Sequence, residues 1–180
     1  MFFDFYYKYF IKDEVETNRA HYALAEMEKK GLLSSVITQN IDNLHQKAGS
    51  QNVLELHGTA MKNNCVNCGY KVPLEYIKEL KGAVPRCPKC GGTVKPLVTL
   101  YEEALDEKVT NRAVREIAQA DTLIIGGTSL AVYPAAMYIR YFGGENLVLV
   151  NREPTQYDGM ATLIFRESVG QVLEDTVKLL

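Results

Sequence analysis

The four cysteines of this sequence are spaced in a way that points to one kind of chemistry. They form two C-x2-C pairs, "CVNC" and "CPKC", with glycines directly behind each pair, and they are Cys65, Cys68, Cys87 and Cys90. Four thiolates complete the tetrahedral shell of a zinc ion and leave no position open for water, so we expect one structural zinc ion. A redox C-x-x-C motif is the alternative, and two pairs at the spacing of a zinc ribbon argue against it.

The stretch "VITQNIDNLHQKAG", residues 36–49, begins with apolar β-branched residues and then becomes polar at Gln39, Asn40 and Asp42. In an open parallel sheet the carboxyl ends of the strands border the ligand crevice. Amide and carboxylate groups at such a strand end can hydrogen-bond a sugar or a base, so the stretch indicates a small-molecule site. The alternative is a polar turn in which Asp42 caps a short helix that Gly49 ends.

Two further apolar segments end in groups that suit a nucleotide. The segment "IIGGTSLAVYP" places Gly127, Thr128 and Ser129 where a strand ends, and "LVLVN" leaves Asn151 and the nearby Glu153 at another strand end. Glycines let a ligand approach the backbone, and hydroxyls near a helix amino end can bond phosphate or ribose. Glu153 can bond ribose hydroxyls, or it is a solvated loop charge. Three polar strand ends at one edge of a sheet favour a nucleotide site.

The three histidines differ in their expected roles. His57 lies in "ELHGT", in a turn between the sheet and the cysteine-rich insert, and an imidazole that titrates near neutral pH is a natural general base. His21 falls within a predicted helix and is expected to pack there. His45 falls on a short helix after the polar stretch, where we expect it to orient its neighbours. His57 is therefore the candidate catalytic residue.

Helix and strand patterns alternate along the chain on both sides of the insert. Asn18 caps a helix that runs to Lys30 and stops at Gly31, and Ser168 with Gln171 forms a capping box for a closing helix. The remaining predicted strands are at 33–38, 98–101, 122–127, 146–151 and 161–165, and residues 53–56 form a short strand or a turn. Helices are predicted at 106–120 and from Pro134 to Gly143. The alternation predicts an α/β fold, with a Rossmann-like parallel sheet, helices on both faces and a small zinc-ribbon module.

We expect two structural parts. Residues 1–59 and 98–180 form the Rossmann-like lobe, and residues 60–97 form the zinc-ribbon module. The opening segment "MFFDFYYKYF" contains seven aromatic residues in ten. As a helix it would be apolar almost all round, so it needs other structure to cover it.

The overall composition excludes several classes of partner. The 180 residues are 47% hydrophobic and carry a net charge of −2, which suits one compact domain, or one with a small appendage, and gives no reason to expect a nucleic-acid partner or an anionic membrane. The insert is rich in lysine, but Tyr70 and Tyr76 are its only aromatic residues, so it lacks a stacking platform for nucleic acid. No apolar run reaches membrane-spanning length, and the first residues lack the basic region and cleavage site of a secretory signal, so we expect a cytoplasmic protein.

Five motifs in this order and at these spacings resemble the sirtuin family of NAD-dependent protein deacylases, over essentially the whole chain. They are "TQNIDNLH", "ELHG", the paired C-x2-C motifs, "GGTSLAVYP" and "VN". The resemblance implies that a Rossmann-like lobe binds NAD and that an acyl-lysine peptide enters between it and the zinc ribbon. It places Gln39, Asn40 and Asp42 around the nicotinamide end, His57 as the catalytic base, and Gly127, Thr128, Ser129, Asn151 and Glu153 at the adenosine half.

The resemblance also implies the reaction and the peptide site. The acyl-lysine carbonyl oxygen attacks the ribose carbon that bears nicotinamide, and nicotinamide, free lysine and acyl-ADP-ribose are released. A peptide strand would pair with the segment Val98, Thr99, Leu100 and Tyr101 on one side and lie against Ala131 and Val132 on the other.

The chain departs from the family in several places. The family opens with a strand and a loop of the type G-A-G-x-S, followed by a segment ending in D-F-R, and no G-x-G occurs here. Leu97, Glu102 and Glu167 replace residues that are usually Asp, Gly and Gly. We therefore expect an amino-terminally truncated member: a deacylase when intact, or alternatively a catalytically inactive binding or scaffold protein. As it stands, the chain is expected to bind NAD poorly and to leave Phe2, Phe3, Phe5 and Tyr6 uncovered.

Overall fold

The computed structural model describes residues 2–11, 15–80 and 82–180, and these residues cluster into two compact units. The cysteine unit comprises the described part of Met1–Glu16 together with Asn40–Asn43 and His57–Leu105. The sheet unit comprises Thr17–Gln39, Leu44–Leu56 and Asp106–Leu180. The predicted division into a Rossmann-like lobe at 1–59 and 98–180 and a zinc-ribbon module at 60–97 stays a prediction.

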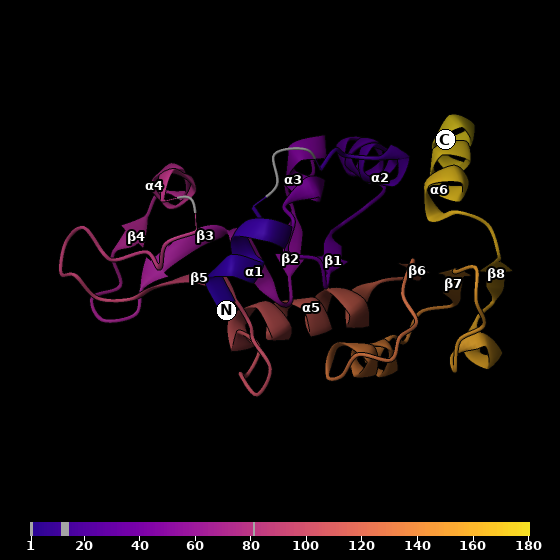
Figure 1. The fold of residues 1–180 in the computed structure, drawn as a ribbon. Helices are drawn as coiled ribbons and strands as arrows, with labels where there is room; N and C mark the ends of the chain where they lie inside the picture. The colour runs from indigo at the N-terminus through magenta and orange to yellow at the C-terminus, as the bar shows by residue number, and fades with distance from the viewer. Residues whose placement is uncertain (1, 12–14, 81) are drawn as a thin grey trace. The chain divides into compact units, whose positions relative to one another are not determined.

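The strands of the sheet unit pair in parallel, as their apolar runs predict. Strand β1 (Val36–Thr38) pairs with β2 (Val53–Glu55), and β6 (Thr122–Gly126), β7 (Asn146–Val150) and β8 (Leu163–Phe165) form a second sheet in that order (Figure 1). In the second sheet Gly126 lies opposite Val150, and Val150 lies opposite Phe165. Because all three strands run in the same direction, the residues that follow them meet at one edge.

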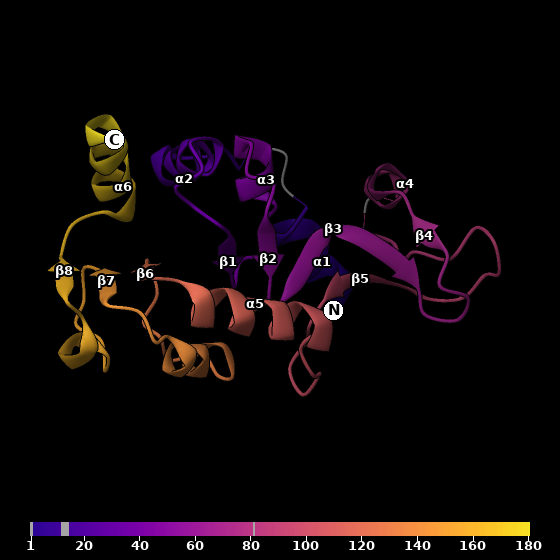
Figure 2. The same cartoon turned by 180° about the vertical axis from the view of Figure 1, so that it is seen from behind.

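Helices lie on both sides of these strands, as the α/β prediction requires (Figure 2). They are α2 (Arg19–Lys29), α3 (Leu44–Ala48), α5 (Glu107–Gln119) and α6 (Val169–Leu179), with 3₁₀ helices at Ala135–Tyr141 and Asp158–Met160. The segment after Pro134 is thus a 3₁₀ helix. It packs through Ala136 and Ile139 onto Leu147 and Leu149 of β7, which forms the core beside the second sheet.

The ends of α2 follow the predicted capping pattern. The Asn18 side chain accepts a hydrogen bond of 3.0 Å from the Ala20 N–H, and His21 Nδ1 accepts one of 3.1 Å from the Asn18 N–H. Gly31, with φ of +74°, follows the helix in the left-handed conformation that glycine adopts without strain. The predicted capping box of α6 is wrong, because Ser168 makes no side-chain cap and Gln171 bonds to Arg19 instead.

The cysteine unit contains an antiparallel sheet. Its strands are β3 (Gly58–Cys65), β4 (Lys71–Val72) and β5 (Val94–Val98), in the order β4-β3-β5, and its helices are α1 (Phe2–Tyr9) and α4 (Leu74–Glu79). The strand predicted at 98–101 is wrong, because the paired residues are 94–98. A Cβ at Gly58 would lie 1.9 Å from the Leu97 carbonyl oxygen, so glycine permits β3 and β5 to approach closely here.

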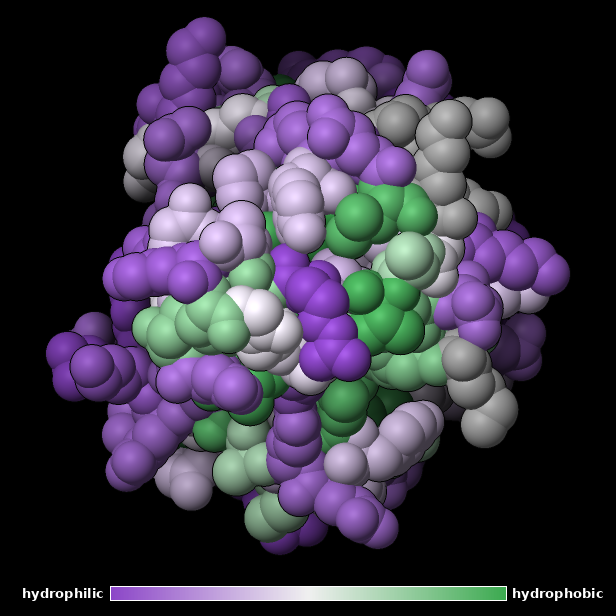
Figure 3. Space-filling model, turned by 60° about the vertical axis from the view of Figure 1, so that its left-hand side comes forward, coloured by the Kyte–Doolittle hydropathy of each residue, from purple (hydrophilic) through white to green (hydrophobic). Residues whose placement is uncertain are grey.

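Helix α1 is partly covered by its own unit. Tyr6 is fully buried among apolar residues of β3, β4, α4 and β5, and Phe3 packs against the same cluster. The prediction that Phe3 and Tyr6 are uncovered is therefore wrong, whereas Phe2 and Phe5 remain exposed, with Phe5 at 51%. On the face that Figure 3 draws, hydrophobic residues gather in patches between hydrophilic ones.

Among the described residues, no helix has the length and apolarity to cross a membrane.

Candidate functional site

The four cysteines come together in the cysteine unit. Their Sγ atoms all lie within 4.8 Å of one another, and the Cys65–Cys90 and Cys68–Cys90 pairs are 3.5 Å and 3.4 Å apart. Each C-x2-C pair is followed by a glycine with positive φ that turns the chain back: Gly69 N–H donates to Cys65 O, and Gly91 N–H donates to Cys87 O. The structure thus confirms the predicted cluster.

The chemistry of the cluster fits zinc. Burial opposes ionisation of Cys65, but hydrogen bonds from the main-chain N–H groups of Cys68 and Asn67 and from the thiols of Cys90 and Cys68 together lower its pKa to about 7. The Gly92 N–H favours the thiolate of Cys90, but the neighbouring thiols of Cys68 and Cys65 raise the pKa of Cys90, so the metal-free cluster retains protons. A thiolate is the form that binds metal, and four thiolates in a closed set are typical of structural zinc. Such a site supplies folding energy to the small unit around it.

The sheet unit contains an open pocket of about 450 Å³ at the carboxyl end of its second sheet. Three residues predicted to face adenosine, Gly127, Asn151 and Glu153, line it together with the first residues of α2 and α6. Thr128 and Ser129 do not line it, and Thr128 Oγ1 instead accepts the Leu130 N–H within the following turn. The pocket lies where parallel strands end, which is where the sequence placed a nucleotide.

Local hydrogen bonds fix the backbone at the pocket floor. The Gly127 N–H donates to Val150 O at 3.0 Å, and the Asn151 side chain donates to Glu153 O at 2.7 Å. Gly126 gives α6 room, since a Cβ there would lie 3.0 Å from Cγ1 of Val169. One role of this glycine is therefore close helix packing, in addition to the ligand access that the sequence suggested.

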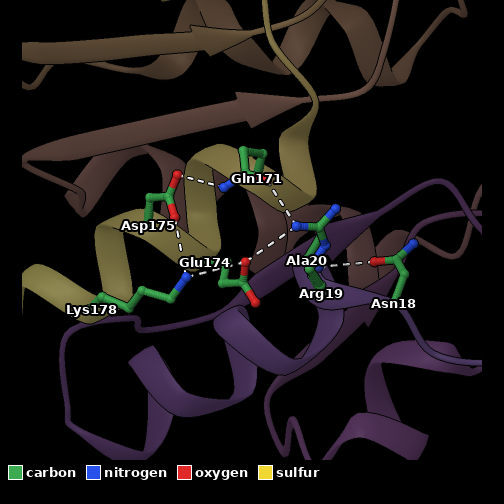
Figure 4. Close-up of polar contacts among 7 residues, drawn as sticks. All are labelled: Asn18, Arg19, Ala20, Gln171, Glu174, Asp175 and Lys178. Carbon is green, nitrogen blue, oxygen red and sulfur yellow. Dashed lines mark hydrogen bonds and ion pairs between the residues drawn. The ribbon is translucent and has the colours of Figure 1, made fainter.

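One wall of the pocket is held by polar contacts between α2 and α6 (Figure 4). The Arg19 guanidinium donates to Gln171 Oε1 at 2.8 Å and lies 3.3 Å from Glu174 Oε2. Glu174 also pairs with Lys178 at 3.4 Å. These contacts keep the amino ends of both helices at the pocket, where their main-chain N–H groups favour an anionic or hydroxyl-rich ligand.

Sequence reasoning missed several pocket residues. Arg19, Arg152 and Ser168 line the pocket but did not enter the predicted nucleotide site. Arg166 supports it from outside the lining, because its guanidinium donates to Asn151 O at 3.1 Å and pairs with Asp158. The sequence did predict that helices begin at Asn18 and Ser168. However, no short-range sequence pattern indicates that the starts of these two helices lie side by side at one pocket.

The residues predicted around the nicotinamide are divided between the two units. Gln39 follows β1 in the sheet unit, whereas Asn40 and Asp42 belong to the cysteine unit. The neighbouring Ile41 carbonyl accepts the Ala60 N–H at 3.0 Å, which ties this short stretch to β3. Gly49 ends the short helix α3, as the local pattern predicts. The role of these polar residues stays a prediction.

His57 lies in the turn between β2 and β3 and is half-buried. Its carbonyl oxygen accepts a hydrogen bond of 3.0 Å from the Thr99 N–H, so the candidate base and the candidate peptide segment are joined through their backbones. The other two histidines pack together in the sheet unit, where the rings of His21 and His45 meet edge to face with centroids 4.7 Å apart. His21 therefore packs within the structure, as predicted.

The peptide segment begins where β5 ends. Val98 is buried and paired with Gly58, Thr99 and Leu100 are half-buried, and Tyr101 is fully exposed. The two residues predicted on the other side of the peptide, Ala131 and Val132, are exposed residues of the sheet unit. The segment thus leaves the strand before Thr99.

Comparison with known proteins gives a consistent result. A model described as "Sir2 family" matches residues 1–134. A Clostridium acetobutylicum "NAD-dependent protein deacetylase" is 51% identical over 176 residues, covering 98% of this chain and 72% of that protein. A Pyrococcus furiosus "NAD-dependent protein deacylase" is 43% identical over 185 residues, covering 96% of this chain and 72% of that protein.

Solved structures agree in fold. One described as "Sir2-p53 peptide-NAD+" is 38% identical, with a TM-score of 0.85 over 92% of this chain and 71% of that one. Another, "Structural Basis for the Mechanism and Regulation of Sir2 Enzymes", is 41% identical, with a TM-score of 0.88 over 98% of this chain and 73% of that one. The chain therefore spans about 70% of the length of each of these proteins.

Proposed function

The chain belongs to the Sir2 family, and from that membership we propose that it is a NAD-dependent protein deacetylase or deacylase. The observation that carries this function is the 51% identity to a NAD-dependent protein deacetylase across 98% of the chain. The substrates are NAD and an acyl-lysine peptide, which accords with the peptide and NAD+ named for a similar solved structure. The products are nicotinamide, free lysine and acyl-ADP-ribose.

The adenosine half of NAD is assigned to the pocket of the sheet unit. Glu153 can accept hydrogen bonds from ribose hydroxyls, and Gly127 lets the ligand approach the main chain. Asn151 holds the loop that carries Glu153, since its side chain donates to the Glu153 carbonyl. Thr128 and Ser129 follow Gly127 but do not line this pocket, so their assignment to the adenosine half rests on the family motif "GGTSLAVYP" alone. Gln39, Asn40 and Asp42 are assigned to the nicotinamide end.

His57 is assigned the role of general base. Bound NAD supplies the ribose carbon that loses nicotinamide and receives the acyl oxygen. His57 then takes the proton of a ribose hydroxyl, which an imidazole can do near neutral pH. The hydrogen bond from Thr99 N–H to His57 O fixes the backbone on which this side chain is carried.

The acyl-lysine peptide is assigned to the main chain after β5. The segment of Val98, Thr99, Leu100 and Tyr101 would pair with the peptide backbone. The family resemblance also assigns Ala131 and Val132 to peptide binding. Main-chain pairing gives affinity without demanding a particular peptide sequence.

We also place the protein in the cytoplasm, where a reducing environment keeps four free cysteines available for zinc.

An assay of nicotinamide release tests the proposal. The zinc-loaded chain is incubated with NAD and an acetyl-lysine peptide, and a peptide with unmodified lysine is the control. Nicotinamide release that depends on the acetyl group supports the function. It also contradicts the expectation of poor NAD binding, which rests on the absence of a G-x-G motif from these 180 residues. Peptide binding without release by folded, zinc-loaded protein supports the alternative of an inactive binding protein.

A further inference from the structure

The chain that leaves β5 makes a tight turn closed by a side chain. The Glu103 N–H donates to Leu100 O at 3.1 Å, and the Glu103 carboxylate accepts the Leu100 N–H at 2.9 Å, so these two residues are bonded twice. Glu102, the third residue of the turn, has φ of +70°. A turn with positive φ at this position normally takes glycine, so a glutamate here needs support from its surroundings.

Lys95 supplies part of that support. Its ammonium group pairs with the second oxygen of the Glu103 carboxylate. Lys95 lies on β5 and is paired with Asn64 of β3, so the turn is tied to the antiparallel sheet. The hydrogen bond from the Leu100 N–H, and to a smaller extent the one from Lys95, hold the pKa of Glu103 below its ordinary value. The carboxylate therefore stays ionised at neutral pH.

The turn determines which backbone groups remain for a partner. Thr99 N–H is bonded to His57 O, and Leu100 N–H is bonded to Glu103. In the part of the chain that the structure describes, no hydrogen bond engages the N–H of Tyr101 or of Glu102. Both residues are exposed, and the Tyr101 side chain has no cover at all. Two successive donors are thus presented at the tip of the turn.

We propose that Glu103, supported by Lys95, is a positioning residue that holds residues 99–103 so that the N–H groups of Tyr101 and Glu102 meet carbonyl oxygens of the acyl-lysine peptide. The proposal rests on the function proposed above and deepens it. Glu103 itself does not touch the peptide. Without its carboxylate, Leu100 N–H would compete for the peptide and Glu102 would relax from its left-handed conformation.

Peptide affinity and kinetics test this role. We expect Glu103→Ala to weaken binding of a fluorescein-labelled acetyl-lysine peptide about tenfold, by anisotropy, which corresponds to about 1.4 kcal/mol. The apparent KM for peptide should rise in proportion while kcat changes less than about twofold, because only binding is impaired. Glu103→Gln retains an acceptor for Leu100 N–H and should restore most of the affinity. Glu102→Gly should bind at least as tightly as the parent chain.

Two controls make the result specific. Glu75→Ala removes an equivalent exposed charge from α4 of the same unit and should bind peptide like the parent. Hydrogen exchange at the Leu100 amide should accelerate in Glu103→Ala and not in Glu75→Ala. If Glu103→Ala exchanges faster but binds peptide like the parent, the turn is merely structural and the proposal fails. If the parent itself neither binds the acetylated peptide nor releases nicotinamide, the proposed function fails, and the role of Glu103 fails with it.

Discussion

The hydroxyl of Tyr6 donates a hydrogen bond of 2.6 Å to the carbonyl oxygen of Ala60, although the two residues are 54 positions apart. The Asn63 side chain donates to the same hydroxyl at 3.1 Å, and both Tyr6 and Asn63 are buried. Helix α1 is therefore attached to β3 by a polar contact inside an apolar cluster. Buried polar groups of this kind cost free energy when a partner is removed.

Tyr6→Phe should lower the free energy of unfolding of the cysteine unit by about 1–3 kcal/mol, since it leaves Ala60 O and Asn63 without their partner. Urea unfolding followed by hydrogen exchange in β3 measures the change. Tyr70→Phe, at an exposed tyrosine of the same unit, is the matched control and should change stability by less than about 0.5 kcal/mol. Equal stability of the two variants would show that the buried contact contributes nothing net.

The buried hydroxyl of Tyr6 should also make the protein less stable at alkaline pH. Burial raises the pKa of Tyr6, because the interior disfavours the charged phenolate. The unfolded chain therefore loses this proton at a lower pH than the folded one. The stabilisation is complete below the ordinary tyrosine pKa of about 10 and is lost as the pH rises above it. Tyr6→Phe should be less sensitive than the parent to pH above about 10, measured by urea midpoints.

Replacing Cys87 by serine should abolish zinc binding and unfold much of the cysteine unit while the sheet unit stays folded. The reason is that a structural zinc ion supplies much of the folding energy of a small module. Metal analysis and hydrogen exchange measure the two effects. Val66→Ala changes an exposed residue between two of the ligands and should keep the metal. Carefully purified parent protein without zinc would contradict the prediction.

Gly58→Ala should destabilise the cysteine unit by about 3 kcal/mol or more, since the new Cβ meets the Leu97 carbonyl oxygen and φ is +72°. The strain falls beside His57, so peptide binding should weaken as well. Gly143→Ala is the control, because no atom lies within 4 Å of the position of its Cβ. Denaturant midpoints that coincide for the two variants would rule out close approach of β3 and β5 at this residue.

In an intact form of the protein, His57→Ala should reduce the turnover of acetyl-lysine peptide by about 10² or more, the usual effect of losing a general base, and should leave the fold intact. His45→Ala is the comparison, because His45 packs on His21 in the sheet unit. Nicotinamide release and circular dichroism measure activity and fold. Turnover near the parent value for His57→Ala, with activity abolished in folded His45→Ala, would identify His45 as the catalytic histidine.

Glu153→Gln should weaken ADP-ribose binding about tenfold, since a carboxylate accepts ribose hydroxyls more strongly than an amide does. Calorimetry with ADP-ribose and with inorganic phosphate separates the ribose contribution from simple attraction of an anion. Glu145→Gln makes the same change at an exposed residue outside the pocket. If Glu153→Gln binds ADP-ribose as tightly as Glu145→Gln does, Glu153 is a solvated loop charge, which is the alternative that the sequence left open.

Much of the candidate site could be predicted because its signals are local. The spacing of Cys65, Cys68, Cys87 and Cys90 specifies a zinc ligand set wherever the module lies, and the structure brings the four thiols together. Asn18 and Gly31 delimit α2 through hydrogen bonds and a backbone conformation that involve only neighbouring residues. Asn151 and Glu153 were found because parallel strands end at one edge of a sheet, which is a rule of topology.

Other features depended on packing between distant segments. The close approach of Gly58 to Leu97 and the burial of Tyr6 both depend on segments distant in the sequence, so neither is visible in the local pattern. Gln171 was expected to cap α6 and instead accepts a hydrogen bond from Arg19, 152 residues earlier. The sequence by itself therefore determined the α/β class, the zinc ligands and the strand-end residues, since short-range periodicity and spacing encode them. Only the tertiary structure decided which helix starts surround the pocket and which side chain closes the turn after β5, because those contacts form when separate segments pack.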